Sequence, residues 1–198
     1  MSQRKTNRRD FLRGKLADAP AARGAQDAET TPDAEAREEG YLVQVGRDAM
    51  AGRFEIFLNA GQYDRGVEVA LAALDLVDAL ESQLSIFRPA SEISKINREA
   101  ADRPVEVEAG LFGLLEMAVE LHGETDGALD ITASPLSDAW GFSRRQGRVP
   151  SPEELAAALA QVGCHRVALD APSRSIRFTT PGVRLNLGAI GKGYALDR

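Results

Sequence analysis

A change of apolar period near residue 60 constrains the fold of this chain more than any other feature. Residues 41–45 and 53–59 alternate apolar side chains with other residues, which predicts two β-strands. Ala51-Gly52 lies between them and allows a hairpin turn. Residues 63–84 then place apolar side chains three and four positions apart, which predicts a long amphipathic helix. Strands and helices are therefore expected to be segregated along the chain.

The rest of the chain continues this segregation. The clearest local signal is Ser151-Pro152-Glu153-Glu154, in which the serine suits a helix N-cap and Glu154 can bond back to it. Helices are expected over residues 91–98, 110–122 and 152–162, and another begins near residue 194. Strands are expected over residues 165–169, 175–179 and 183–187. The predicted fold class is α+β.

Composition excludes several classes of protein. The 198 residues are 43% hydrophobic and 27% charged, which is typical of a soluble globular domain. The net charge of -6 argues against a nucleic-acid partner, because phosphate binding needs a basic surface. No transmembrane segment is expected, since no apolar run approaches roughly 18 residues. The single cysteine, Cys164, cannot form an internal disulfide.

Residues 1–40 differ from the remainder and are expected to form a disordered tail before a domain at residues 41–198. The first 15 residues are basic, and NRRDFLR resembles a twin-arginine export signal. The following KLADAPAARGAQDAE is not an apolar core, so the motif is a degenerate signal, a weak one or a plain basic tail. Residues 20–39 are rich in Ala, Asp and Glu without periodicity. Localisation is therefore cytoplasmic, or periplasmic if the motif works.

The final segment, LNLGAIGKGYALDR, combines a predicted strand, a glycine-rich turn and the start of a helix. Glycines let a backbone approach a phosphate, and a helix N-terminus presents N–H groups to it. Only Ala189-Ile190 separates Gly188 from the Gly191-Lys192 pair, whereas a Walker-type loop has four residues there. Leu196 departs from the dinucleotide fingerprint. By itself the pattern fits either a phosphate site or a tight turn with a surface lysine, Lys192.

Three other segments allow two interpretations each. Asp130 can cap a following helix, or it can accept a hydrogen bond from a ring N–H or a ribose. Phe87, which follows the long helix, can stack on an aromatic ligand or belong to the core. Trp140 and Phe142 form an aromatic pair in a loop, where packing is the simpler role.

The order of these segments resembles one known family. Met50, followed by LSIFRPASEISKIN, TDGALDITASPLSDAWGF and LNLGAIGKGYALD, is similar to the ApbE family of flavin transferases over residues 41–198. The resemblance implies the ApbE-like fold, FAD as substrate and a divalent metal, usually Mg²⁺. It also implies transfer of the FMN half of FAD to a threonine hydroxyl of a target protein, with release of AMP. A metal on the pyrophosphate would neutralise the charge that develops during such a transfer.

The resemblance also implies a set of site residues, with the catalytic residue left unknown. Met50 corresponds to a methionine that packs against the flavin, and Phe87 to an aromatic residue, often Tyr, that contacts FAD. Asn186 stands where the family often has Asp, and Ala189 where a backbone carbonyl contacts the metal. The implied cofactor-binding residues are Met50, Phe87, Ala128, Leu129, Asp130, Asn186 and Lys192, and the implied metal-binding residue is Ala189.

The chain departs from the family pattern in length. Family members are much longer, and the part beyond this region carries an Asp and a Thr that complete the metal site. The chain is therefore expected to be the N-terminal portion of a transferase. A non-catalytic flavin-binding module, an inactive fragment and an FAD hydrolase giving FMN and AMP are the alternatives.

Overall fold

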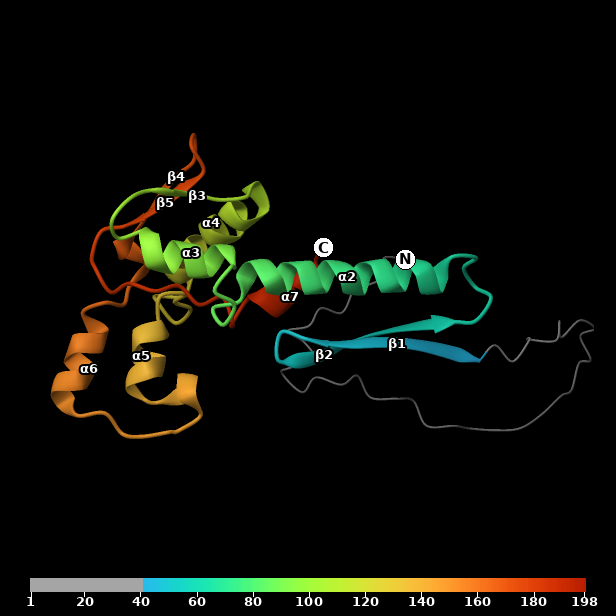
Figure 1. Cartoon of the computed structure of the whole chain (residues 1–198), viewed down its shortest axis with the longest axis horizontal. Helices are drawn as coiled ribbons and strands as arrows, with labels where there is room; N and C mark the ends of the chain where they lie inside the picture. The colour runs from blue at the N-terminus through green and yellow to red at the C-terminus, as the bar shows by residue number, and fades with distance from the viewer. Residues whose placement is uncertain (1–40) are drawn as a thin grey trace, which may run out of the picture. The chain divides into compact units, whose positions relative to one another are not determined.

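The computed structural model describes residues 41–198 (Figure 1). The predictions for residues 1–40, including the tail and the export motif, lie outside the described residues. In chain order the elements are β1 (Leu42–Ala49), β2 (Gly52–Asn59), α2 (Gly66–Leu84), α3 (Glu92–Glu99), β3 (Val105–Glu106), α4 (Ala109–Glu124), α5 (Ser134–Ala139), the 3₁₀ turn η1 (Phe142–Arg144), α6 (Pro152–Leu159), the 3₁₀ turn η2 (Cys164–Arg166), β4 (Val167–Asp170), β5 (Ser175–Phe178) and α7 (Gly191–Leu196).

The predicted hairpin is present, with its turn one residue earlier than expected. β1 and β2 pair antiparallel from Leu42 opposite Asn59 to Ala49 opposite Gly52. The two turn residues are Met50 and Ala51, whose φ angles of 50° and 55° place both in the left-handed region. This backbone matches the right-handed twist of paired strands, which is why the turn forms although neither residue is glycine.

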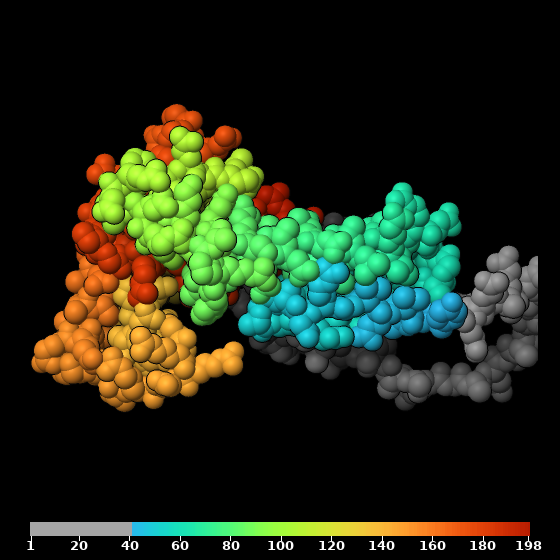
Figure 2. Space-filling view, in the orientation of Figure 1, coloured from blue at the N-terminus to red at the C-terminus, as the bar shows by residue number. Residues whose placement is uncertain are grey.

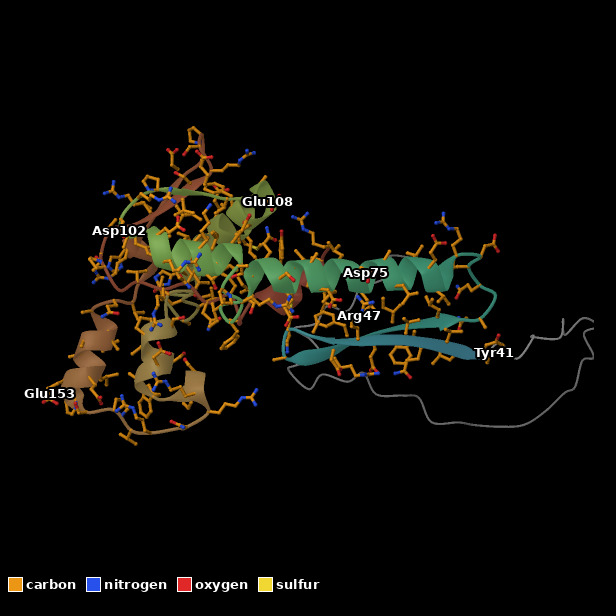
Figure 3. All side chains as sticks on the ribbon, viewed as in Figure 1. Tyr41, Arg47, Asp75, Asp102, Glu108 and Glu153 are labelled. Atoms are coloured by element: carbon orange, nitrogen blue, oxygen red, sulfur yellow. The ribbon has the colours of Figure 1, made fainter. Side chains whose placement is uncertain are left out.

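β1 continues past residue 45, where the apolar alternation ends, because an arginine occupies the next inward position. Arg47 lies on the face of the hairpin that packs against α2. Its guanidinium donates to Asp75 and Asp78 of α2, each at 2.6 Å. Figure 3 shows Arg47 and Asp75 facing each other across this contact. The strand pattern therefore continues with an ion pair in place of an apolar contact.

α2 buries its apolar stripe mainly along its second half. Leu74, Val77 and Leu80 are buried as predicted, whereas Val67 and Leu71 are 47% and 44% exposed. Ala70 and Leu84 complete the buried face. The predicted stripe was wrong in the first turns because the face that packs on the hairpin passes through Ala70.

The main core lies among the C-terminal half of α2, helices α3 and α4, and a second sheet. That sheet has the order β3-β5-β4, and both pairings are antiparallel. Ile93, Leu111, Leu115, Ile176 and Leu185 are each 0% exposed within it. Around this core the capping box at Ser151 is present and starts α6 as predicted. Strand β4 of the second sheet starts two residues later than predicted, at Val167, because Cys164–Arg166 forms η2 before it.

The predicted strand at residues 183–187 is extended but forms no sheet ladder within the described part of the chain. Leu185 instead bonds to a side chain: its N–H donates to Asn97 Oδ1 at 2.7 Å, and its carbonyl accepts from Asn97 Nδ2 at 3.0 Å. The N–H of Asn186 donates to the Ile131 carbonyl at 2.7 Å. The strand prediction was therefore wrong, while its alternation was right, since Val183, Leu185 and Leu187 are all buried.

Candidate functional site

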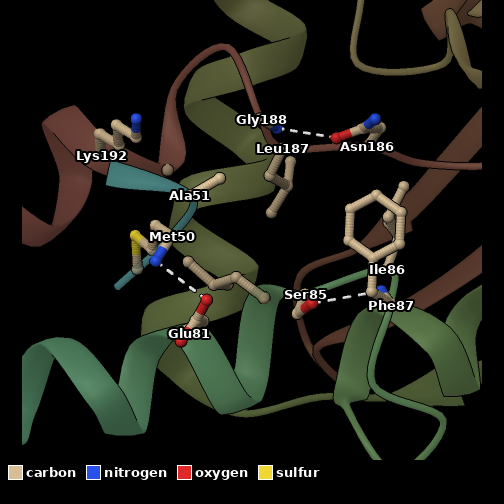
Figure 4. A pocket seen from close by; sticks show the side chains of 12 residues that line it. Met50, Ala51, Glu81, Ser85, Ile86, Phe87, Asn186, Leu187, Gly188 and Lys192 are labelled. Carbon is tan, nitrogen blue, oxygen red and sulfur yellow. Dashed lines mark hydrogen bonds between the residues drawn. The ribbon is translucent and has the colours of Figure 1, made fainter. Parts of the chain in front are cut away.

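A cavity of about 350 Å³ lies where the hairpin turn, the end of α2 and the segment before α7 meet (Figure 4). This volume falls in the range of small-molecule sites. Four residues that the resemblance implies, from distant parts of the sequence, line it together. The lining residues are Met50, Ala51, Glu81, Leu84, Ser85, Ile86, Phe87, Asn186, Leu187, Gly188, Gly191 and Lys192.

Met50 reaches the cavity because α2 holds the hairpin turn. The backbone N–H of Met50 donates to Glu81 Oε1 at 2.9 Å. The other oxygen of Glu81 accepts from Arg88 at 2.9 Å, so an ion pair balances the charge of this carboxylate at the cavity wall. The left-handed φ of Met50 is a strained conformation that surrounding contacts must maintain. Glu81 supplies such a contact from a separate element.

Phe87 is not a core residue, which corrects one of its two interpretations. Its side chain is 77% exposed at the cavity rim. Its N–H donates to Ser85 Oγ at 3.1 Å, and the Ser85 carbonyl accepts from Ser91 Oγ at 2.6 Å. These bonds fix the backbone that carries the ring, so an exposed aromatic face stands beside the cavity without being packed away.

The segment after the extended residues 183–187 turns sharply because Asn186 bonds to the backbone. Asn186 Oδ1 accepts from the N–H of Gly188 at 2.8 Å, which is an Asx turn. An aspartate would supply the same acceptor, so the turn is compatible with either residue. α7 then starts at Gly191, three residues earlier than predicted.

Lys192 brings a positive charge to this cavity. Its ammonium lies against Gly52, where an added Cβ would come within 2.9 Å of Nζ. Within residues 41–198 the ammonium forms no ion pair with a carboxylate, in contrast to Arg47, Arg53 and Arg88. An unpaired ammonium beside an apolar cavity suits a phosphate.

Ala128, Leu129 and Asp130 do not line this cavity. Ile131, which follows them, accepts a hydrogen bond through its carbonyl from the N–H of the lining residue Asn186. Ala189 sits in the turn between Asn186 and α7, and its carbonyl accepts no hydrogen bond from the described residues. The structure thus brings together four of the eight implied residues in one cavity lining, which does not include the other four.

Asp130 organises a small polar cluster in place of capping a helix. Its Oδ1 accepts from the N–H and the hydroxyl of Thr132 at 2.7 and 2.6 Å, and α5 starts only at Ser134. His122 Nδ1 lies 3.5 Å from Asp130 Oδ2, and Cys164 Sγ lies 3.5 Å from Oδ1. Sequence spacing had not indicated that these groups would meet.

The cluster is a hydrogen-bonded network around a protonated thiol. Burial and the nearby charge of Asp130 raise the pKa of Cys164 to about 11. His122 Nδ1 also lies 2.9 Å from the Leu129 carbonyl. The ligand atoms of His122, Asp130 and Cys164 lie within 4.8 Å of one another, and the Cys164 thiol donates to Asp130 while His122 bonds to the Leu129 carbonyl. The network therefore holds the loop at residues 128–132 against α4 and η2.

Sequence reasoning missed Glu81 and the small polar side chain of Ser85. Glu81 follows the helical pattern of α2 as an ordinary polar residue, so no local signal marks it. Ser85 follows the last residue of α2, where a polar residue is expected. Glu81 acts through its bond to the distant hairpin turn, and Ser85 acts through bonds to residues that follow it.

The family of the chain follows from comparison with known proteins. The sequence profile of the ApbE family matches residues 50–198, so the chain belongs to that family. The crystal structure of the ApbE protein from Thermotoga maritima matches with a TM-score of 0.72 and 30% identity, and covers 80% of this chain. The flavin transferase ApbE from Vibrio cholerae matches with a TM-score of 0.69 and 26% identity, again over 80% of the chain. The predicted ApbE-like α+β fold is thereby confirmed.

Curated relatives agree with this assignment. The FAD:protein FMN transferase of Haemophilus influenzae is 32% identical over 124 residues, which is 60% of this chain and 36% of that protein. The enzyme of the same name from Klebsiella pneumoniae is 31% identical over 136 residues, which is 69% of this chain and 43% of that protein. The chain thus spans less than half the length of these relatives, and 51–52% of the two solved structures. Within residues 41–198, no helix is both long and apolar enough to cross a membrane.

Proposed function

We propose that this chain is a flavin transferase that binds FAD and moves FMN from it to a threonine hydroxyl of a target protein. The observation that carries the proposal is the convergence of Met50, Phe87, Asn186 and Lys192 on one cavity. Relatives that carry the name FAD:protein FMN transferase support the same reaction. In that reaction the threonine oxygen bonds to the FMN phosphorus, the P–O–P link of FAD breaks, and AMP leaves.

The residues present fit FAD. Leu84, Ile86 and Leu187 give the cavity apolar walls, and Met50 and Phe87 also line it, which suits a planar aromatic ring. Lys192 supplies a positive charge at the same cavity, where the pyrophosphate of FAD carries negative charge. An apolar wall beside one cation matches a ligand with a ring at one end and phosphates beyond it.

The residues also fit part of a Mg²⁺ site. A backbone carbonyl is a hard oxygen ligand of the kind that Mg²⁺ accepts, and the Ala189 carbonyl is not engaged by the described residues. When bound, Mg²⁺ would neutralise charge on the pyrophosphate. Lys192 would stabilise the same phosphates, and Glu81 would keep Met50 in its left-handed conformation against the ring.

Three outcomes of one experiment separate the proposal from its alternatives. The chain is incubated with FAD, MgCl₂ and an acceptor protein that carries a threonine. Flavin fluorescence is then measured on the denatured acceptor, and AMP and free FMN are measured in solution. A transferase leaves flavin on the acceptor and releases AMP, and replacing the threonine by valine abolishes the labelling. Free FMN with AMP would instead show an FAD hydrolase, and intact bound FAD a non-catalytic flavin-binding module.

A further inference from the structure

A pair of aromatic rings is exposed at the end of α5. Trp140 and Phe142 stack on each other with ring centroids 6.4 Å apart and planes 10° apart, yet they remain 36% and 65% exposed. Gly141 between them has a φ of 74°, and a Cβ there would meet the Gln146 carbonyl at 2.5 Å. The turn therefore requires glycine and presents both rings outward. The two rings pack on each other, as the simpler interpretation predicts.

Arginines surround a second cavity next to these rings. This cavity, of about 530 Å³, is lined by Asp138, Gly141, Arg144, Gln146, Arg148 and Arg184. Arg184 pairs with Asp138, and Arg148 pairs with Glu154 at 2.9 Å. Arg144 forms no ion pair within residues 41–198. The surface is thus locally positive on a chain whose net charge is -6.

Asp138 offsets the charge of Arg184, with which it pairs, so Arg144 is the lining arginine without an ion pair within residues 41–198. Burial alone would raise the pKa of Asp138, but hydrogen bonds from Ser143 and Arg184 outweigh it and lower the pKa. The carboxylate of Asp138 therefore accepts hydrogen bonds from Ser143 and Arg184. Arg144 and the outer edge of Arg148 remain available to an approaching anion.

A third cavity shares lining residues with both the arginine-lined cavity and the candidate flavin site. This third cavity, of about 420 Å³, is lined by Ile86 and Phe87, which also line the flavin cavity. It is lined as well by Asp138 and Arg184, which also line the arginine-lined cavity. The third cavity therefore lies between Phe87 and Arg184, each of which also lines one of the other two cavities. Figure 2 shows the α5 and α6 segments, in orange, at the surface of the molecule.

We propose that the α5–η1 surface, defined as Trp140, Phe142, Arg144 and Arg184, docks an acidic segment of the acceptor protein. The inference rests on the proposed function, because it assigns the surface to the protein substrate of that reaction. The two rings supply the exposed aromatic anchors typical of binding hot spots, and the arginines supply charge complementarity. The segment then follows the adjoining cavities, which brings its threonine toward Phe87.

The first experiment measures binding alone, so that it does not depend on catalysis. The probe is a fluorescent peptide with a threonine flanked by aspartates, and the reference is the same peptide with asparagines in their place. Anisotropy should show tighter binding of the aspartate peptide, and the difference should shrink as salt rises. Equal binding of the two peptides overturns the proposal. Tighter binding of a labelled single-stranded RNA than of either peptide would also overturn it, in favour of a nucleic-acid surface.

Variants then locate the binding. Phe142→Ser and Arg144→Glu should each weaken peptide binding by about tenfold, which corresponds to about 1.4 kcal/mol. Arg177→Glu on β5 is the matched control, since Arg177 is exposed and does not line these cavities. FAD affinity should stay unchanged in all three, which excludes misfolding as the cause. Wild-type affinity in both surface variants, or an equal loss in the control, overturns the assignment.

Flavin transfer distinguishes this inference from the proposed function. With the acceptor protein as substrate, the surface variants should raise the KM for the acceptor and leave the KM for FAD unchanged. If the wild-type chain binds the aspartate peptide but transfers no flavin, the proposed function fails while the docking surface stands. If transfer occurs and the variants leave the acceptor KM unchanged, the docking surface fails while the function stands.

Discussion

The carboxylate of Glu81 and the backbone N–H of Met50 are joined by a 2.9 Å hydrogen bond between the end of α2 and the hairpin turn. This contact links two parts of the chain that are separated by 31 positions. It also holds Met50 in a left-handed conformation at the wall of the cavity. The wall that we assign to the flavin ring therefore depends on a residue outside every motif of the family resemblance.

Replacing Glu81 tests this dependence. Glu81→Ala should weaken FAD binding by about tenfold, because a net hydrogen bond to a charged group contributes about 1.5 kcal/mol. Glu81→Gln should weaken it less, since the amide oxygen can still accept from Met50. Quenching of FAD fluorescence during titration measures both affinities. Glu116→Ala, at an exposed position of α4, is the control. Equal affinities in all four proteins would contradict the role of Glu81.

Lys192 should distinguish FAD from flavins that lack phosphate. Lys192→Met keeps the apolar stem and removes the ammonium, so FAD affinity should fall by about tenfold while riboflavin affinity stays the same. Parallel titrations with the two ligands measure the ratio. Lys95→Met on α3 changes the same charge at an exposed position away from the cavity. A matching loss of riboflavin affinity would show that Lys192 supports the cavity by packing.

Asn97 should stabilise the fold through its two bonds to Leu185. Asn97→Ala removes both bonds, at 2.7 and 3.0 Å, and leaves the backbone groups of a buried residue unsatisfied. The free energy of unfolding should fall by about 2–3 kcal/mol. Urea denaturation gives the value, and Asn59→Ala at the exposed end of β2 should change it by less than about 0.5 kcal/mol. A loss in Asn97→Ala no larger than in this control would contradict the prediction.

Cys164 should make stability depend on pH in the alkaline range. Its pKa is raised from 9.0 to about 11 in the folded chain, so the folded state holds the proton more tightly than the unfolded state. This contribution is fully present below pH 9 and is lost as the pH rises toward 11, with a slope of at most about 1.4 kcal/mol per pH unit.

The variant Cys164→Ser isolates this contribution, because serine can donate to Asp130 and does not titrate in this range. The free energy of unfolding, measured in urea at several pH values, should fall more steeply for the wild type than for the serine variant above pH 9. Parallel curves for the two proteins would show that the thiol keeps an ordinary pKa.

Local patterns determined most of the secondary structure. The hairpin, α2, α3, α4 and β5 follow from apolar periodicity, and α6 follows from the capping box at Ser151. Each of these signals involves residues within a few positions of one another, so a short stretch of sequence includes every residue that takes part in the interaction. The secondary-structure predictions are wrong where a residue far away in the sequence supplies the bonding partner. Residues 183–187 bond to Asn97 in place of a neighbouring strand, and β1 extends because Arg47 meets α2.

The family resemblance named the residues of the candidate site, and the tertiary structure decided which of them meet. Met50 and Lys192 line one cavity because α2 and α7 pack around a shared core, whereas Asp130 is drawn toward His122 and Cys164. Phe87 remains exposed because backbone bonds at Ser85 hold it at the rim. The sequence by itself determined the periodic elements, since helices and strands depend on contacts within a few residues. Only the tertiary structure decided the cavity, because its walls come from segments that packing alone brings together.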